Sequence, residues 1–170
     1  MTGGMKIVSR QNERIREAKR LAQKKYRDQM GLFVAEGVRL VEEALEASLV
    51  EQLFFAQRLL SSSRGKDLVQ RAQARAVQVW ECTDAVLSEM TDTVHSQGVA
   101  AVVRKPSWPP PSCGMVVIAD EIQDPGNMGA LLRTAAAAGA QGLLVVKGSV
   151  DVYSPKVLRA SMGAVFHLPH

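Results

Sequence analysis

Short apolar runs alternate with helix-like stretches through residues 31–105, and this alternation limits the possible folds more than any other feature of the chain. Four runs have the character of strands: GLFVAEG (31–37), VEQLFFA (50–56), AVQVWEC (76–82) and GVAAVVRK (98–105). The stretches between them favour helices at 38–47, 66–75 and 84–92. Strands joined through helices of this length need crossover connections, so we predict a small α/β domain.

A proline-rich stretch, KPSWPPPSCG (105–114), interrupts this pattern. Four prolines in ten residues cannot enter the interior of a sheet, and they favour an extended spacer. We therefore predict an N-terminal domain at 1–104, a linker at 105–114 and a second domain at 115–170. A single domain with a long proline loop is the alternative.

The second domain is expected to begin as a strand–helix–strand–helix–strand unit. MVVIAD (115–120) is typical of a parallel strand buried on both faces, and GLLVV (142–146) and AVFHLP (164–169) are the other predicted strands. A helix is expected at 127–138, and Ser154 and Pro155 suit the N-cap and first position of another. Because doubly wound domains usually need about 100 to 150 residues, we expect only the first portion of such a domain.

Positive charge gathers in residues 9–30, with eight basic and three acidic residues, although the net charge of the chain is only +4. We expect one basic helix over 10–26, which either contacts the phosphate backbone of a nucleic acid or forms an ordinary solvated face. Trp80 and Phe33 could stack on bases, but each lies in a strand-like run and is expected in the core. The candidate phosphate contacts are Arg10, Arg14, Lys19 and Lys24.

The cysteines and histidines are too scattered for a disulfide framework or a metal site. They are Cys82, Cys113, His95, His167 and His170. No segment is typical of a secretory leader or approaches the roughly 20 apolar residues that cross a bilayer. We therefore expect a soluble cytoplasmic protein that holds no metal.

The loop DEIQDPGN (120–127) follows the first strand of the second domain, at the strand end where open α/β sheets bind ligands. Pro125 and Gly126 suit the centre of a type II turn, which places Asn127 at a helix N-cap. Arg133 lies off the apolar stripe of the following helix, and its guanidinium can reach back over the strand ends. A plain cap and a surface arginine are the alternative roles of Asn127 and Arg133.

Two common nucleotide-binding signatures do not match this loop. The dinucleotide fingerprint needs three glycines in G-x-G-x-x-G spacing, whereas Gly126 and Gly129 stand three residues apart. A phosphate-binding loop needs lysine and a hydroxyl residue after its second glycine, where Ala130 and Leu131 stand. A nicotinamide-dependent enzyme therefore has little support.

The segments DEIQDPGNMGALLRTAAAAGAQGLLVV (120–146) and DVYSPKVLRASMGAVFHLP (151–169) resemble the first conserved blocks of the SpoU/TrmH family of RNA 2'-O-ribose methyltransferases. GLFVAEGVRLVEEAL (31–45) and TDTVHSQGVAAVV (91–103) are similar to that family's N-terminal substrate-binding domain. The resemblance implies an α/β RNA-binding domain followed by the first part of a Rossmann-like SPOUT domain, which carries a trefoil knot.

The same resemblance implies methyl transfer from S-adenosylmethionine to a ribose 2'-hydroxyl of structured RNA, with ribosomal RNA expected and a homodimer as the complete enzyme. Asn127 and Arg133 match the family's first motif, in which the arginine is regarded as catalytic. Because a guanidinium stays protonated, we expect Arg133 to stabilise the developing 2'-oxyanion and grip a phosphate, and Asn127 to fix the loop. Ser161 and Gly163 match a later, less diagnostic block.

The later motifs that build the family's cofactor pocket, one resembling L-G-N-E-G, are absent from these 170 residues. The cofactor-binding residues therefore stay unassigned, and we expect this chain alone to bind S-adenosylmethionine poorly or not at all. A stretch of a longer enzyme is expected, with a shortened natural or engineered form as the alternative. A non-catalytic RNA-binding protein is the alternative function.

Overall fold

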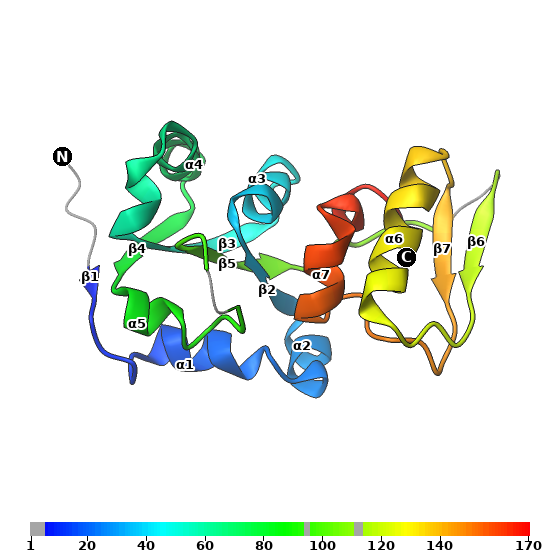
Figure 1. The fold of residues 1–170 in the computed structure, drawn as a ribbon, viewed down its shortest axis with the longest axis horizontal. Coiled ribbons are helices and arrows are strands. Elements are labelled where there is room, and N and C mark those ends of the chain that lie inside the picture. Colours follow the sequence, from blue (N-terminus) through cyan, green and yellow to red (C-terminus); the bar gives the residue numbers. More distant parts are fainter. Residues whose placement is uncertain (1–5, 94–95, 111–113) are drawn as a thin grey trace. The chain divides into compact units, whose positions relative to one another are not determined.

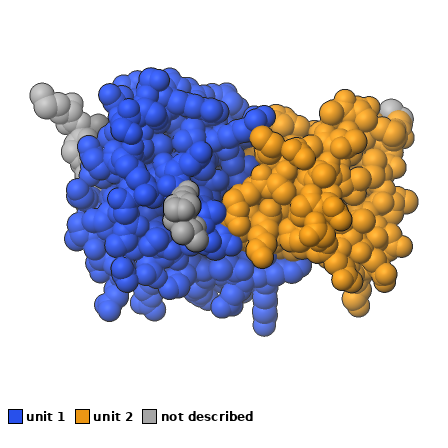
Figure 2. All heavy atoms as spheres, in the orientation of Figure 1, with its two compact units in different colours: residues 1–105 blue, residues 106–170 orange. Residues whose placement is uncertain are grey.

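The computed structural model describes residues 6–93, 96–110 and 114–170, so that His95 and Cys113 lie outside the described residues. The chain divides into two compact units, Met1–Lys105 and Pro106–His170 (Figure 2). Each unit has a sheet of its own, with five strands in the first and two in the second. Within the described residues, no helix has the length and apolar character needed to span a membrane.

The first unit is built on a mixed sheet in the order β1-β4-β3-β5-β2 (Figure 1). Its strands are β1 (Lys6–Ile7), β2 (Leu32–Glu36), β3 (Val50–Ala56), β4 (Gln78–Cys82) and β5 (Val99–Arg104). β3 pairs with β4 in parallel, as the crossover pattern predicts, whereas β5 is antiparallel to both β2 and β3. The four predicted strands are confirmed, and two-residue β1 is too short for a sequence pattern to reveal.

Helices cover both faces of this sheet (Figure 1). One face carries α3 (Val38–Glu46) and α4 (Ser63–Ala74), and the other carries α1 (Glu13–Arg20), α2 (Lys24–Met30) and α5 (Asp84–Leu87). A short 3-10 helix, η1 (Gln57–Ser61), follows β3. The apolar stripe of α3 is buried, as its periodicity requires: Leu40, Val41, Ala44 and Leu45.

The single helix expected over 10–26 is wrong, because the chain breaks between α1 and α2. Arg27 explains the break: its guanidinium is buried and donates from Nη1 to the carbonyl oxygens of Leu21 and Ala22, each at 2.7 Å. These carbonyls would otherwise lack partners at the helix end. Leu21 is buried, whereas Ala22 is exposed.

The second unit pairs β6 (Val116–Ala119) in parallel with β7 (Gly142–Val145). Helix α6 (Pro125–Ala137) packs against β7, and α7 (Pro155–Ser161) packs against α6. The two helices approach closely at Gly129, where an added Cβ would lie 2.3 Å from the Cβ of Ala160. Only a residue without a side chain fits this crossing.

Two expectations for the second unit are wrong. Residues 164–169 form no strand: η2 (Ala164–Phe166) follows Gly163, whose φ of +97° turns the chain. The Pro169 carbonyl bonds to β7, at 2.8 Å from the Leu143 N–H. β6 is not buried on both faces, because Val116 is 43% exposed and Ile118 63% exposed. The described residues thus leave one apolar face of this sheet open to solvent.

Candidate functional site

Helix α6 begins directly after the loop that follows β6, and Asp124 is its N-cap. The Asp124 Oδ1 atom accepts a hydrogen bond from the Asn127 N–H at 2.7 Å. The predicted type II turn and the N-cap role of Asn127 are therefore wrong. Pro125 and Gly126 are already helical, and proline is well placed there because the first helical N–H needs no intrahelical partner.

Hydrogen bonds between the loops after β6 and β7 hold the carboxyl end of this sheet together. The Ser149 hydroxyl donates to the Ala119 carbonyl and accepts from the Ile122 N–H, both at 3.1 Å. The Val150 N–H adds a bond to the Ile122 carbonyl at 2.8 Å. Sequence reasoning missed Ser149, because its partners lie 27 and 30 residues earlier in the chain. These bonds give the N-terminus of α6 a fixed support.

The structure places Asn127 and Arg133 on the same helix, both with exposed side chains. Six residues of helix separate them by about 9 Å along the axis and by about 120° around it. The Nη1 atom of Arg133 lies 3.2 Å from the Met162 sulfur, a weak acceptor. The guanidinium therefore keeps most of its hydrogen-bonding capacity for a ligand.

The later block has a structural role around α7. Ser161 is fully buried and its hydroxyl donates to the Leu158 carbonyl at 2.8 Å. Met162 and Gly163 both have positive φ, which ends α7 and directs Met162 outward. Ser161 therefore belongs to the α6–α7 crossing, and Met162 is the residue of this block that reaches Arg133.

The four candidate phosphate contacts all lie on the surface of the first unit, yet each already has a partner. Glu89 binds Arg10 at 3.5 Å and Lys19 at 2.6 Å, and Lys24 binds Asp28 at 2.6 Å. The Arg14 guanidinium lies over the Trp80 ring, 4.3 Å from its centroid. These three ion pairs involve cations that are more than 60% exposed, and such pairs are weak enough to exchange for phosphate.

These cations lower the pKa values of the neighbouring carboxylates. Hydrogen bonds from Lys105 and then Lys24 lower the pKa of Asp28 to about 2. A hydrogen bond from Lys19, with a smaller contribution from the charge of Arg10, lowers the pKa of Glu89. Both carboxylates thus stay ionised at neutral pH.

Two further cations of the basic segment, Arg16 and Lys25, were not singled out from the sequence. Both are exposed, and within the described part of the chain neither side chain has an ion-pair or hydrogen-bond partner. The i,i+4 spacing of Lys24 and Asp28 could have indicated one of the pairs, whereas Glu89 lies too far along the chain for such a signal. Phe33 is buried as expected, whereas Trp80 is only half-buried under Arg14.

Comparison with known proteins identifies both units. Residues 12–101 match the MRM3-like substrate binding domain, and residues 114–170 match the SpoU rRNA Methylase family. The chain belongs to the SpoU family of RNA methyltransferases. The relationship expected from the sequence and the α/β architecture of this SpoU protein are thereby confirmed.

Two bacterial methyltransferases align along almost the whole chain. The chain is 32% identical over 164 residues to the 23S rRNA (guanosine(2553)-2'-O)-methyltransferase RlmP of Bacillus subtilis, and this alignment covers 96% of the chain and 63% of RlmP. It is 35% identical to an uncharacterized tRNA/rRNA methyltransferase of Synechocystis, covering 96% of the chain and 60% of that protein. The chain thus spans about three fifths of the length of these relatives.

Solved structures show the same SpoU architecture. The AdoMet-bound rRNA methyltransferase of Sinorhizobium meliloti matches with a TM-score of 0.79 and 32% identity, over 96% of this chain and 62% of that one. The SpoU methyltransferase AviRb of Streptomyces viridochromogenes, in complex with AdoMet, matches with a TM-score of 0.78 and 28% identity, over 93% and 60%. AdoMet is S-adenosylmethionine, the cofactor that the sequence resemblance implies.

A cavity of about 350 Å³ in the second unit does not suit that cofactor by itself. It is lined by residues of β6 and β7, by three prolines, and by Trp108 and His170. Its side chains are mostly apolar, including Val116, Leu143 and Leu144, whereas the amino-acid and ribose groups of S-adenosylmethionine need polar partners. No group of three or more metal-ligating side chains occurs among the residues that the structure describes.

Proposed function

We propose that this protein acts in 2'-O-ribose methylation of structured RNA, with S-adenosylmethionine as methyl donor and ribosomal RNA as substrate. The observation that carries the proposal is the SpoU rRNA Methylase match over residues 114–170, next to a substrate binding domain at residues 12–101. RlmP, a 23S rRNA 2'-O-methyltransferase, supports the same reaction class by its similarity.

In this proposal Arg133 acts on the RNA. A 2'-hydroxyl is a weak acid, and the guanidinium cannot remove its proton because it stays charged. Arg133 instead stabilises the developing 2'-oxyanion and binds a neighbouring phosphate through its fork of N–H groups. Its exposure on α6, with a thioether as its recorded hydrogen-bond partner, suits that role. Asn127, in the first turn of α6, would fix the loop that leads into this helix.

Four finer statements belong to the same proposal. The complete enzyme would be a homodimer, its catalytic domain would carry a trefoil knot, and it would work in the cytoplasm without a metal. Size-exclusion chromatography with light scattering tests the dimer directly.

A non-catalytic RNA-binding protein is the second candidate. The observation that favours it is the mostly apolar lining of the cavity in the second unit, which offers few polar partners to the cofactor. The two functions share RNA binding and differ in cofactor binding, so affinity for S-adenosylmethionine separates them.

The deciding experiment uses the protein at its natural length. S-adenosylmethionine is first titrated by calorimetry, and radiolabelled methyl transfer to ribosomal RNA is then measured. Saturable binding and label in 2'-O-methylnucleosides are expected. A folded protein that binds RNA but shows neither result would support the non-catalytic function.

A further inference from the structure

The first unit contains a small cavity between α1, α2 and the face of the sheet that these helices cover. Its volume is about 40 Å³, and it is partly open to solvent. Tyr26 from α2 and Arg14 from α1 line it, together with Leu32 and Gln52 from β2 and β3. A space of this size holds about one water-sized group, such as the polar edge of a larger ring.

Two buried polar atoms on this face of the sheet, one of them in the cavity lining, lack hydrogen-bond partners among the described residues. They are Oε1 of Gln52, an acceptor, and Nε1 of Trp80, a donor. Gln52 pairs with Gln78 in the sheet, so Trp80, two residues further along β4, is its diagonal neighbour on the same face. Leaving a buried polar atom unpaired is unfavourable, and such atoms in a folded protein call for a ligand or a water molecule.

Two residues that line the cavity, Arg14 and Tyr26, also take part in stacked cation–π pairs. The guanidinium of Arg20 lies over the Tyr26 ring at 4.0 Å from its centroid, and that of Arg14 lies over Trp80 at 4.3 Å. Arginine planes and aromatic rings are the surfaces on which unpaired RNA bases stack. The cavity therefore combines the polar Gln52 with the flat groups of Arg14 and Tyr26, and the Glu17 carboxylate also lines it.

We propose that this cavity is a subsite for one unpaired nucleobase of RNA. The polar edge of the base enters and donates an N–H to Gln52 Oε1, while its ring stacks on Tyr26 or Arg14. A base offers acceptor atoms to the Trp80 N–H on the same edge. The subsite rests on the RNA binding proposed above and adds to it a contact that reads a base rather than a phosphate.

The experiment compares single-stranded RNA decamers of each base with an abasic ribose-phosphate decamer, by fluorescence anisotropy at several salt concentrations. Gln52→Leu removes the acceptor and keeps most of the side-chain volume. Gln73→Leu, which changes an exposed residue of α4, is the control. Gln52→Leu is expected to weaken binding of base-containing RNA about tenfold, the effect of one base-edge contact. The salt dependence and the abasic affinity should not change, because no phosphate contact is lost.

A second measurement works on the unaltered chain, in case Gln52→Leu folds poorly. The side-chain N–H signals of Gln52 and Trp80 in NMR spectra should shift with a base-containing decamer and stay in place with the abasic one. Equal affinities of the wild type and Gln52→Leu, or signals that do not respond to bases, would overturn the subsite alone. Absence of any RNA binding by the wild type would instead contradict the proposed function.

Discussion

Arg133 is the residue whose chemistry is most specific in the second unit. Its planar guanidinium offers parallel N–H donors, whereas lysine offers a point charge. We expect Arg133→Lys to lower kcat in the protein at its natural length by about 10- to 100-fold, because a bidentate contact to developing charge is lost. Single-turnover methyl transfer measures this effect, and Arg39→Lys, an exposed residue of α3, serves as control. Turnover near that of the wild type would mean that charge alone suffices.

Position 129 requires glycine for a steric reason, because it lies where α6 and α7 cross. An added Cβ would lie 2.3 Å from the Ala160 Cβ and 2.6 Å from its carbonyl carbon. Gly129→Ala is therefore expected to lower the free energy of unfolding by about 1 to 3 kcal/mol through overpacking. Urea titration measures this loss. Gly126→Ala, whose added Cβ would meet only Asp124 Oδ1 at 3.0 Å, should lower the free energy of unfolding by less.

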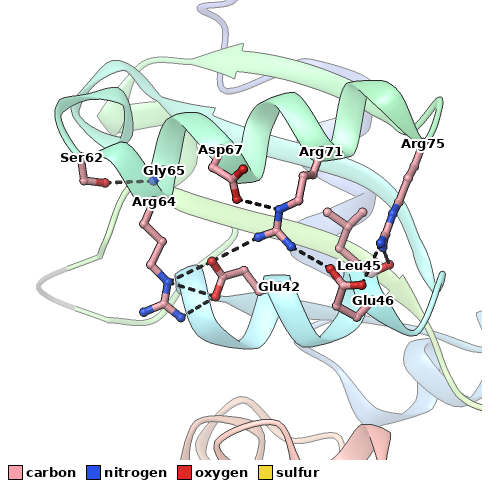
Figure 3. A network of polar contacts seen from close by, with 9 residues as sticks. All are labelled: Glu42, Leu45, Glu46, Ser62, Arg64, Gly65, Asp67, Arg71 and Arg75. Atoms are coloured by element: carbon pink, nitrogen blue, oxygen red, sulfur yellow. Dashed lines mark hydrogen bonds and ion pairs between the residues drawn. The ribbon is translucent and has the colours of Figure 1, made fainter.

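At the scale of elements, an ion-pair network joins α3 to α4 (Figure 3). Glu42, whose side chain is 16% exposed, binds Arg64 and also Arg71 at 3.4 Å, while Glu46 binds Arg71 and Arg75, each at 2.7 Å. We expect Glu42→Gln to destabilise the first unit by about 1 to 2 kcal/mol, because it leaves two arginines without their shared carboxylate.

The measurement is urea unfolding at low and high salt, and the loss should shrink as salt screens the network. Asp67→Asn is the control, since Asp67 is 60% exposed and contacts Arg71 within the same helix. Equal losses in both variants would show that the network adds nothing beyond ordinary surface pairs.

A second link between elements ties Lys105, which follows β5, to α2. Lys105 and Lys24 each lie 2.6 Å from Asp28, whose pKa they lower to about 2 from an ordinary value of 3.8. A lowered folded-state pKa means that the ion pairs stabilise the fold above about pH 4 and that this stability is lost as the pH falls toward about 2. Asp28→Asn should therefore flatten the fall in unfolding free energy over this range. A wild-type curve parallel to that of the variant would contradict the linkage.

The elements with strong apolar patterns could be predicted from the sequence, and those fixed by a single distant contact could not. The strands at 31–37 and 98–105 and the buried stripe of α3 follow from local periodicity. The break between α1 and α2 depends on where the Arg27 guanidinium lies in the folded state. We predicted that α6 begins at residue 127, whereas it begins at Pro125. Asp124 and Pro125 repeat the cap pattern recognised at Ser154 and Pro155.

Among the candidate site residues, the sequence indicated which element would carry each but not what each would contact. Arg14 was selected as a phosphate contact, and the structure stacks it on Trp80. Exposure and partners depend on residues brought together from other strands and helices, so periodicity within one segment does not contain them. The roles of Asn127 and Arg133 in catalysis stay predictions.

At the scale of the whole molecule, RNA binding depends on how many cations of the first unit are available to phosphates. Arg16 and Lys25 are exposed without ion-pair partners in the described residues, so removing them breaks no pair. Replacing both by alanine should weaken RNA binding and lower the slope of log affinity against log salt by about 1.5, the release expected from two phosphates. Lys66→Ala with Arg39→Ala, which also removes two exposed charges, is the matched control. An unchanged slope in the Arg16 and Lys25 variant would make this segment an ordinary solvated face.

The close crossing of α6 and α7 at Gly129 also affects how activity measurements on variants of this protein are interpreted. Any side chain there must displace α7, and α7 leads directly into Met162, the neighbour of Arg133. A screen that scores only methyl transfer would therefore rank Gly129 variants with those of Arg133, although the glycine is buried. Measuring folding and turnover on the same variants separates a misplaced arginine from a missing one.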